Sequence, residues 1–282
     1  MSYQLRESTQ QRRQFEFEVR RLADSLQFGG DPSRFLGSGL EYAQSRPYEP
    51  GDAVKLIDWR ITARTGKPFV KEYETTRQTP IHLVIDTSAS MCVSSLPESK
   101  YHWAVRLGGA LAFAAVERLS PVGVLAGGER DLRVTPTLST TRIMQWVHAL
   151  RTFDFKERTR LSSRLKTLAA ALKTRAMIVV LTDLHEPAAL DALELLAAAH
   201  EVLVLWLQDP AEAELPRGFF RAREAETGSE RVVRGSSRAA QVEAQRESLV
   251  QSGIEFLHLP TAEPVLPRVR HFLKFRKSLG HA

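Results

Sequence analysis

Three oxygen-bearing side chains occupy alternate positions in the run Asp86-Thr87-Ser88-Ala89-Ser90, which directly follows an apolar segment with the character of a strand. Residues two apart can face the same way, so the carboxylate of Asp86 and the hydroxyls of Ser88 and Ser90 can converge. Oxygen donors without imidazole or thiolate suit Mg²⁺, or Mn²⁺ or Ca²⁺, and do not suit zinc. The run therefore predicts a divalent-metal site.

A second carboxylate follows another apolar segment. Asp183 comes directly after residues 176–182. An Asp in this place commonly caps the next helix. In an open α/β sheet, however, ligands bind beyond the carboxyl ends of the strands. We therefore expect Asp183 to join Asp86 at one edge of a sheet as a further metal ligand.

The elements that must position these carboxylates alternate along residues 79–282, which we expect to form one domain. The predicted strands are 80–86, 122–126, 132–135, 176–182, 202–207 and 254–259. The predicted helices are 100–119, 140–150, 162–172, 187–199, 239–251 and 264–279. Near-continuous apolar strands separated by helices predict an α/β fold, a doubly wound, mostly parallel sheet buried on both faces. Residues 211–236, with glycines among many charges, predict a mobile loop or a hairpin.

Residues 1–78 are expected to form an N-terminal extension, part helical and part β-rich. Apolar side chains recur at helical spacing within residues 8–27. Residues 37–74 have three turn signals, short β-like runs and no clear core periodicity, so we expect this stretch to pack against the next domain.

Composition narrows the class of protein. With 43% hydrophobic and 26% charged residues, the chain is typical of an ordinary globular protein. Cys92 is the only cysteine, which excludes an intramolecular disulfide, and we expect a cytoplasmic protein without a membrane segment. Five of the six net positive charges fall in residues 264–282, which favours a solvated helix face over nucleic-acid binding.

The strand–Asp-x-Ser-x-Ser–helix unit resembles the metal-ion-dependent adhesion site of von Willebrand factor A domains. The resemblance implies that a Thr on a second loop and an Asp after a later strand complete the site. Asp183 matches the Asp, and Thr159 is our choice for the Thr. Glu157 and Arg158 stand where that family usually has glycines, so Ser162 or Ser163 are alternatives to Thr159.

A longer signature lies upstream. Residues 46–66, RPYEPGDAVKLIDWRITARTG, and residues 68–74, PFVKEYE, are similar to the signature of the bacterial domain-of-unknown-function family fifty-eight, and similarity extends over about residues 30–260. This resemblance implies a von Willebrand factor A-like domain. It also implies a MoxR-type AAA+ ATPase as partner, with this protein as an adaptor in chaperone-like complex assembly.

The signature also has a structural interpretation. Asp58, Trp59, Arg60 and Arg64 offer an ion pair and an aromatic platform. We expect them to lock an N-terminal flap onto the sheet, and a direct partner contact is the alternative.

The site predicts a binding module and not an enzyme, because its ligands leave one coordination position for an acidic side chain of a partner. A metal-dependent phosphohydrolase using Asp86 is the main alternative, but that class usually needs a second Asp where this chain has Ser88. A third interpretation gives the basic C-terminal helix a nucleic-acid or acidic-partner contact. Cys92 lacks an evident base, and no nucleophile-elbow pattern G-x-S-x-G surrounds Ser88 or Ser90.

Overall fold

The computed structural model describes residues 9–26, 40–75, 79–153, 156–213, 219–223, 230–234 and 239–275. Side chains are described over most of these residues, including 44–71 of the family signature.

One six-stranded sheet organises the molecule, with strand order β10-β7-β6-β3-β4-β5. Its strands are β3 (Ile81–Ile85), β4 (Val122–Ala126), β5 (Arg133–Thr137), β6 (Met177–Thr182), β7 (Glu201–Gln208) and β10 (Glu255–Pro260). All neighbours pair in parallel except β5, which runs antiparallel to β4. The predicted α/β class with a mostly parallel sheet is confirmed, and the strands lie where apolar runs predicted them.

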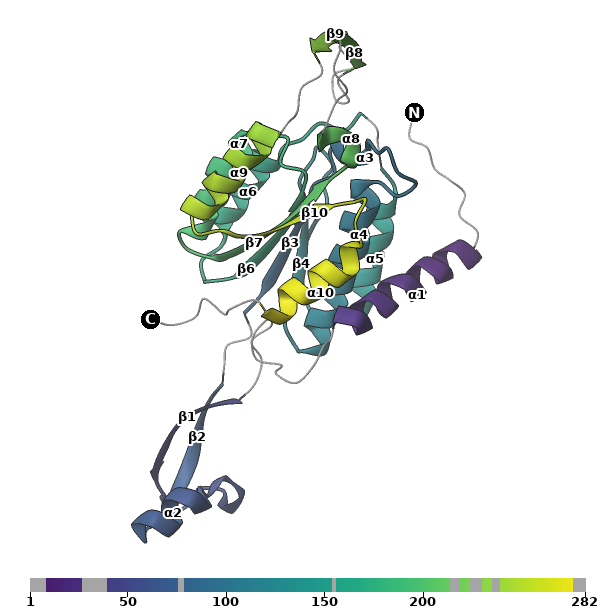
Figure 1. Ribbon diagram of the computed structural model, residues 1–282. Helices are drawn as coiled ribbons and strands as arrows, with labels where there is room; N and C mark the ends of the chain where they lie inside the picture. Colours follow the sequence, from purple (N-terminus) through teal and green to yellow (C-terminus); the bar gives the residue numbers. More distant parts are fainter. Residues whose placement is uncertain are drawn as a thin grey trace.

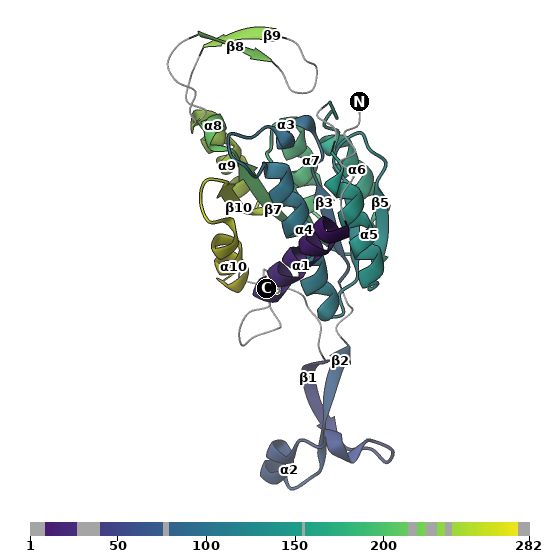
Figure 2. The same cartoon turned by 90° about the vertical axis from the view of Figure 1, so that its right-hand side faces the viewer.

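Helices cover both faces of this sheet (Figures 1 and 2). One face packs against α1 (Thr9–Leu26), α4 (Lys100–Glu117), α5 (Thr140–Arg151) and α10 (Val265–Phe275). The other packs against α6 (Leu161–Ala171), α7 (Ala188–Ala197) and α9 (Ala239–Gln251). Alternation along β3 divides the core, because Leu83 belongs to the first cluster and Val84 to the second. Both are fully buried, as expected for a central parallel strand.

The helix α1 belongs to the core of this sheet. Its residues Val19, Leu22 and Ala23 are buried in the same cluster as α4. The helix crosses α4 in both ribbon views (Figures 1 and 2). The N-terminal helix predicted from its apolar spacing therefore completes one layer of the α/β unit.

The family signature forms a separate arm. Strand β1 (Leu40–Pro47) pairs antiparallel with β2 (Phe69–Thr75), and between them lie the short helix η1 (Val54–Leu56) and the helix α2 (Trp59–Thr65). Asp58 caps α2 by accepting hydrogen bonds from the backbone N–H groups of Arg60 and Ile61, and Gly66 ends it in the left-handed conformation. Proline and turn signals predicted an irregular stretch here, and the short α2 was missed.

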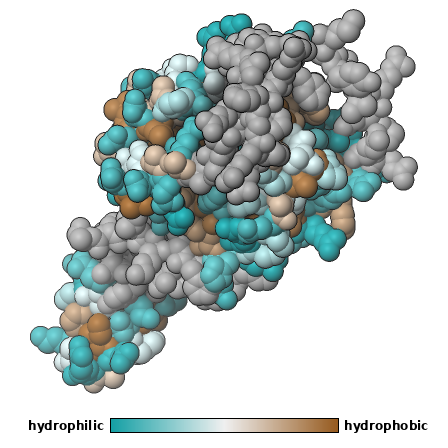
Figure 3. All heavy atoms as spheres, turned by 45° about the horizontal axis from the view of Figure 1, so that its top comes forward, coloured by the Kyte–Doolittle hydropathy of each residue, from teal (hydrophilic) through white to brown (hydrophobic). Residues whose placement is uncertain are grey.

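The expectation that Trp59 locks this segment onto the sheet is wrong. Its side chain is 68% exposed, and Val54 nearby in sequence is 65% exposed. Figure 3 shows apolar surface among hydrophilic surface on the arm, at the lower left. Trp59 therefore faces solvent, and the arm is held together by its strand pairing and the Asp58 cap.

The remaining elements are two short helices that follow strands of the sheet and one separate hairpin. The short helices α3 (Ala89–Cys92) and α8 (Pro210–Ala213) follow β3 and β7. Strands β8 (Phe219–Arg223) and β9 (Glu230–Arg234) pair as an antiparallel hairpin, the second of the two predicted forms of residues 211–236. Of the basic C-terminal residues, Arg268, Arg270 and Lys274 lie on α10, whereas 276 and 277 lie outside the described residues.

Candidate functional site

Asp86 lies in a buried turn at the carboxyl end of β3. Its backbone N–H donates to the carbonyl of Leu181, which extends the pairing of β3 with β6. One carboxylate oxygen accepts a hydrogen bond from the backbone N–H of Ser88 at 3.0 Å, and the other accepts one from the hydroxyl of Thr182 at 2.8 Å. The sheet register thus fixes the carboxylate, which is only 2% exposed.

The two serines of the predicted site lie beside Asp86. Ser88 is buried and precedes α3, in which Ser90 is the second residue. The hydroxyl oxygens of Ser88 and Ser90 are 3.0 Å apart, and Ser90 lies close enough to Asp183 to help lower the pKa of that carboxyl. The alternate spacing therefore brings the hydroxyls together, as the sequence predicts.

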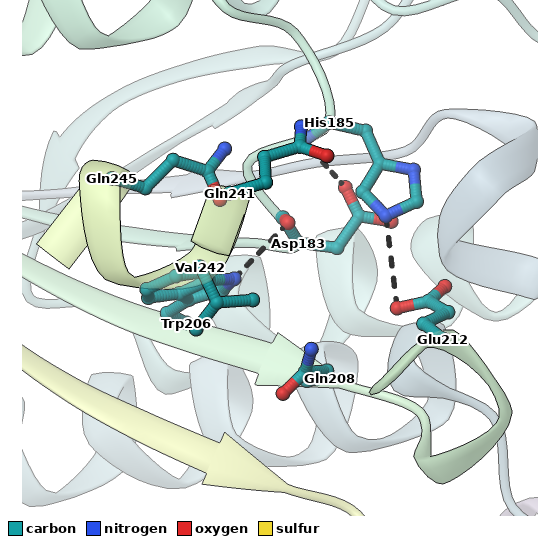
Figure 4. A pocket seen from close by; sticks show the side chains of 8 residues that line it. All are labelled: Asp183, His185, Trp206, Gln208, Glu212, Gln241, Val242 and Gln245. Carbon is teal, nitrogen blue, oxygen red and sulfur yellow. Dashed lines mark hydrogen bonds and ion pairs between the residues drawn. The ribbon is translucent and has the colours of Figure 1, made fainter. Parts of the chain in front are cut away.

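Asp183 lies at the carboxyl end of β6, the strand next to β3. Its carboxylate is close enough to Asp86 to raise the pKa of that residue. Its carbonyl accepts a hydrogen bond from the indole N–H of Trp206 on β7 at 3.1 Å (Figure 4). Neighbouring parallel strands thus place Asp86 and Asp183 together at one edge of the sheet.

A buried lysine pairs with Asp183. The Lys100 ammonium, at the start of α4, lies 2.8 Å from a carboxylate oxygen of Asp183 and also contacts Glu212 of α8. The Lys100 side chain is fully buried. Burial alone would lower the pKa of Lys100, but the two carboxylates raise it above its usual value. Conversely, burial would raise the pKa of Asp183, and the Lys100 ammonium holds it below the usual value.

His185 adds a fourth titratable group to the cluster of Lys100, Asp183 and Glu212. Figure 4 shows the ring of His185 and the carboxylate of Glu212 pointing toward one another, with Nε2 and Oε2 3.6 Å apart. One potential ligand atom from each of Asp183, His185 and Glu212 lies within 4.8 Å of the others. Both carboxylates already contact the Lys100 ammonium, so this group forms an ion-pair network around a built-in cation.

Asp209 ties α8, which carries Glu212, to the segment that follows α3. Its carboxylate accepts hydrogen bonds from the hydroxyls of Ser94 and Ser95 at 3.0 and 2.6 Å. It also accepts the backbone N–H groups of Ser95 and Ala211, each at 2.9 Å. These bonds hold the segment after β7 against the segment after α3, which keeps Glu212 within reach of Lys100.

Asp86 differs from Asp183 in having no such partner. Among the described residues no Lys, Arg or His forms an ion pair with Asp86. Burial first, and the nearby Asp183 second, raise the pKa of Asp86 to about 6. Hydrogen bonds from Ser88 and Thr182 oppose this rise without cancelling it. Asp86 is therefore a buried carboxylate that lacks a cation and whose pKa is raised.

The loop that carries Thr159 packs against the Asp86 turn. The carbonyl of Glu157 accepts the backbone N–H of Ala89 at 2.8 Å, and Thr159 forms a β-bridge with Gly128. The Thr159 hydroxyl donates to Glu186 at 3.3 Å, and a donating hydroxyl keeps lone pairs for another contact.

The two alternatives to Thr159 have other partners. Ser162 bonds to Glu186 through both its hydroxyl and its backbone N–H. The hydroxyl of Ser163 donates to the carbonyl of Arg160 at 2.9 Å and is exposed. The structure thus brings the predicted second loop to the site without distinguishing Thr159 from Ser162 by its bonds, and it turns Ser163 toward its own helix.

A buried glutamate supports this meeting of loops. The Glu157 carboxylate accepts the hydroxyl of Thr87 and pairs with the Arg130 guanidinium, whose Nη2 is 2.6 Å away. At Gly128 an added Cβ would lie 2.5 Å from the Thr87 hydroxyl and 2.3 Å from a Glu157 oxygen. Thus Glu157 acts as a structural tie between the loops, and Gly128 leaves space for it.

Comparison with known proteins identifies the family. The model of the family described as "Protein of unknown function DUF58" matches residues 44–253. This chain belongs to the DUF58 family. Uncharacterized proteins of Mycobacterium tuberculosis and Mycobacterium bovis are each 30% identical over 222 residues, which cover 77% of this chain and 70% of the relative.

A solved structure also matches in part. The crystal structure of an uncharacterized membrane spanning protein from Vibrio fischeri is 14% identical, covers 68% of this chain and 94% of that chain, and has a TM-score of 0.22. At that score it carries no argument about this DUF58 protein. No described helix of the present chain is both long and apolar enough to cross a bilayer.

Several residues of this DUF58 site escaped the sequence interpretation, namely Lys100, Glu157, Thr182, Glu186 and Glu212. A lysine at the start of an Ala-rich, buried helix was one available signal, because an unpaired ammonium is rarely fully buried. The run Gln208-Asp209-Pro210-Ala211-Glu212, itself part of the family resemblance, was another. Cys92 is half-buried, and burial raises the pKa of its thiol to about 12, in line with the absence of an evident base.

Removing the Lys100 ammonium leaves two carboxylates buried without their cation. We expect Lys100→Met to lower the free energy of unfolding by about 3–5 kcal/mol at pH 7.5. The lowered pKa of Asp183 stabilises the wild type above about pH 3.8, and this contribution is lost as pH falls through the folded-state pKa. In the variant, burial without the ammonium should raise the pKa of Asp183, so protonation of this carboxyl should shrink the deficit in urea unfolding at pH 5. Lys166→Met, at an exposed position of α6, is the matched control, and an equal loss in both variants would contradict the assignment.

Because no cation pairs with Asp86 among the described residues, removing its charge should raise the free energy of unfolding, whereas removing the Lys100 charge should lower it. A raised pKa means that the stability contributed by the protonated form is complete below about pH 3.8 and is lost as pH rises through about 6. We expect Asp86→Asn to be more stable than the wild type by about 1–3 kcal/mol at pH 7.5 in EDTA. The gain should vanish near pH 4. Asp191→Asn, an exposed carboxylate of α7, should change little, and a destabilised Asp86→Asn in EDTA would show that the charge is compensated.

Proposed function

We propose that this protein is a metal-dependent protein–protein interaction module whose α/β domain is of the von Willebrand factor A type. The observation that carries the proposal is the buried Asp86 carboxylate beside Asp183. The Lys100 ammonium pairs with Asp183, and no cation among the described residues forms an ion pair with Asp86. A divalent cation would supply the missing positive charge. Oxygen donors only, with no thiolate among them, favour Mg²⁺, with Mn²⁺ or Ca²⁺ as substitutes.

The proposed ligands are Asp86, Ser88, Ser90, Thr159 and Asp183. The first three come from one turn, and Ser88 and Ser90 already lie within 3.0 Å of one another. The Asp183 carboxylate shares its charge with Lys100. Less of its negative charge is therefore available to neutralise a bound cation, which would keep that cation attractive to another carboxylate. This favours a site that accepts an acidic side chain from a partner protein.

The partner that we propose is a MoxR-type AAA+ ATPase, with this protein as its adaptor in chaperone-like complex assembly. Support for this partner comes from the von Willebrand factor A-like and MoxR-associated resemblance of the sequence. The site itself supports only the chemistry of the contact, which is an acidic side chain completing the coordination of the metal. The protein would then act by binding and would need no catalytic group.

Titration calorimetry with MgCl₂ tests the metal site directly. We expect the wild type to bind one Mg²⁺ per chain, Asp86→Ala to lose binding, and Ser90→Ala to weaken it about tenfold or more. Bound metal should also raise the melting temperature of the wild type and not of Asp86→Ala, because a ligand that binds only the folded state stabilises it. Asp191→Ala is the control that keeps the net charge of Asp86→Ala. Binding by Asp86→Ala equal to that of the wild type would refute the site.

The partner is tested separately with a purified MoxR-type ATPase from the same cell. We expect capture in Mg²⁺, loss in EDTA, and loss with Asp86→Ala in either condition. Capture that is indifferent to EDTA would reject the metal bridge while leaving the metal site intact. Release of phosphate from a panel of phosphoesters in Mg²⁺, abolished by Asp86→Ala, would favour the phosphohydrolase alternative.

A further inference from the structure

The tip of the signature arm, taken as residues 44–71, is held together by its own acidic side chains. Asp52 forms a two-pronged ion pair with Arg46, with distances of 2.7 and 2.8 Å, and the pKa of Asp52 is lowered by this contact. Asp58 caps α2 and accepts the hydroxyl of Ser45 at 2.9 Å. Two of the three acids in residues 44–71 are therefore used to build the arm, and Glu49 is the third.

Four cations on the same arm have no such role. Lys55, Arg60, Arg64 and Lys67 are exposed, and none of them makes an ion pair with another described residue. Arg60 and Arg64 stand one turn apart on α2, so both guanidinium groups can reach the same side of the helix. The arm thus presents an excess of positive charge that its own fold does not neutralise.

Exposed apolar side chains accompany these cations. Trp59, the first residue of α2, is 68% exposed, and Val54 of η1 is 65% exposed. A tryptophan this exposed contributes little to folding, because most of its apolar surface stays in water. Trp and Arg are the side chains most enriched among residues that dominate the energy of protein interfaces. The exposed side chains of α2, namely Trp59, Arg60 and Arg64, therefore have the composition of an interface and not of a solvated face.

We infer that this surface docks an acidic protein segment that presents carboxylates around an apolar side chain. The guanidinium fork of an arginine matches a carboxylate in two parallel hydrogen bonds, and Trp59 would cover the apolar side chain. Single-stranded nucleic acid is disfavoured, because Trp59 is the only exposed aromatic side chain among residues 44–71 and such strands stack on several.

The docking surface is independent of the proposed metal site. The arm joins the sheet before β3, whereas Asp86 follows the same strand, so the two lie at opposite ends of β3 (Figures 1 and 2). Binding to the arm should not need a divalent cation. Experiments in EDTA therefore separate this inference from the proposed function.

The test uses the full chain in EDTA and a fluorescein-labelled peptide of fifteen residues in which Glu and Leu are mixed. Anisotropy should show binding that weakens as salt rises. Trp59→Ala should weaken it about 30-fold, the effect of a residue that dominates an interface. Arg60→Ala with Arg64→Ala should weaken it about tenfold and reduce the salt dependence. Leu195→Ala and Lys166→Ala, at exposed positions of α7 and α6, should bind as the wild type does.

The same assay includes the results that would overturn the inference. A peptide with Gln in place of every Glu should not bind, and equal binding of the two peptides would remove the role of carboxylates. Tighter binding of oligo-dT or of vesicles containing phosphatidylserine would assign the surface to nucleic acid or to a membrane. Unchanged binding by Trp59→Ala, which should fold normally because its side chain is exposed, would place the contact elsewhere. Asp86→Ala should bind as the wild type does, and a loss there would assign the peptide to the sheet edge.

Discussion

The repulsion between two buried carboxylates at neighbouring strand ends is the constraint on which the carboxyl edge of this sheet depends. Asp86 and Asp183 are brought together by the parallel register of β3 and β6, in which Ile85 lies opposite Leu181. That register fixes the backbone positions from which the two carboxylates project. The edge must therefore supply positive charge or hydrogen-bond donors, and it does so unequally, since Lys100 pairs with Asp183 and only neutral donors contact Asp86.

The surrounding loops follow from this asymmetry. Lys100 can stay fully buried because Glu212 shares its ammonium, and Glu212 stays in place because Asp209 fastens α8 to Ser94 and Ser95. On the other side of the turn, Glu157 pairs with Arg130. Cations thus pair with Asp183, Glu212 and Glu157, and hydrogen bonds lower the pKa of Asp209, whereas the pKa of Asp86 is raised. Departures from local compensation tend to occur at functional sites, and this one supports the proposed metal site.

Sequence patterns predicted the parts of this arrangement that depend on local chemistry. Apolar runs located the six strands, and the rule that ligands gather at carboxyl ends brought Asp86 and Asp183 together. The ion pair of Lys100 with Asp183 spans 83 residues, and no periodicity in the chain encodes a contact of that range. The prediction that Trp59 locks the arm onto the sheet was wrong for a different reason. An aromatic side chain in a family signature suggests burial, but the arm satisfies its hydrogen bonds without burying Trp59. Thr159 was placed near the site by resemblance, but the competing bond to Glu186 depends on tertiary packing.

The direction of β3 separates the two surfaces that we propose as partner contacts. The signature arm enters the sheet at the amino end of the strand, and the Asp86 turn leaves it at the carboxyl end. A five-residue strand extends about 16 Å, so a partner that touches only one end of the sheet does not reach the other. The two contacts also differ in chemistry, because a carboxylate would meet a cation at one end and arginine beside tryptophan at the other. A partner that engages both must therefore carry acidic groups on two separate surfaces, and an assembly of several subunits meets that requirement more readily than a single small domain.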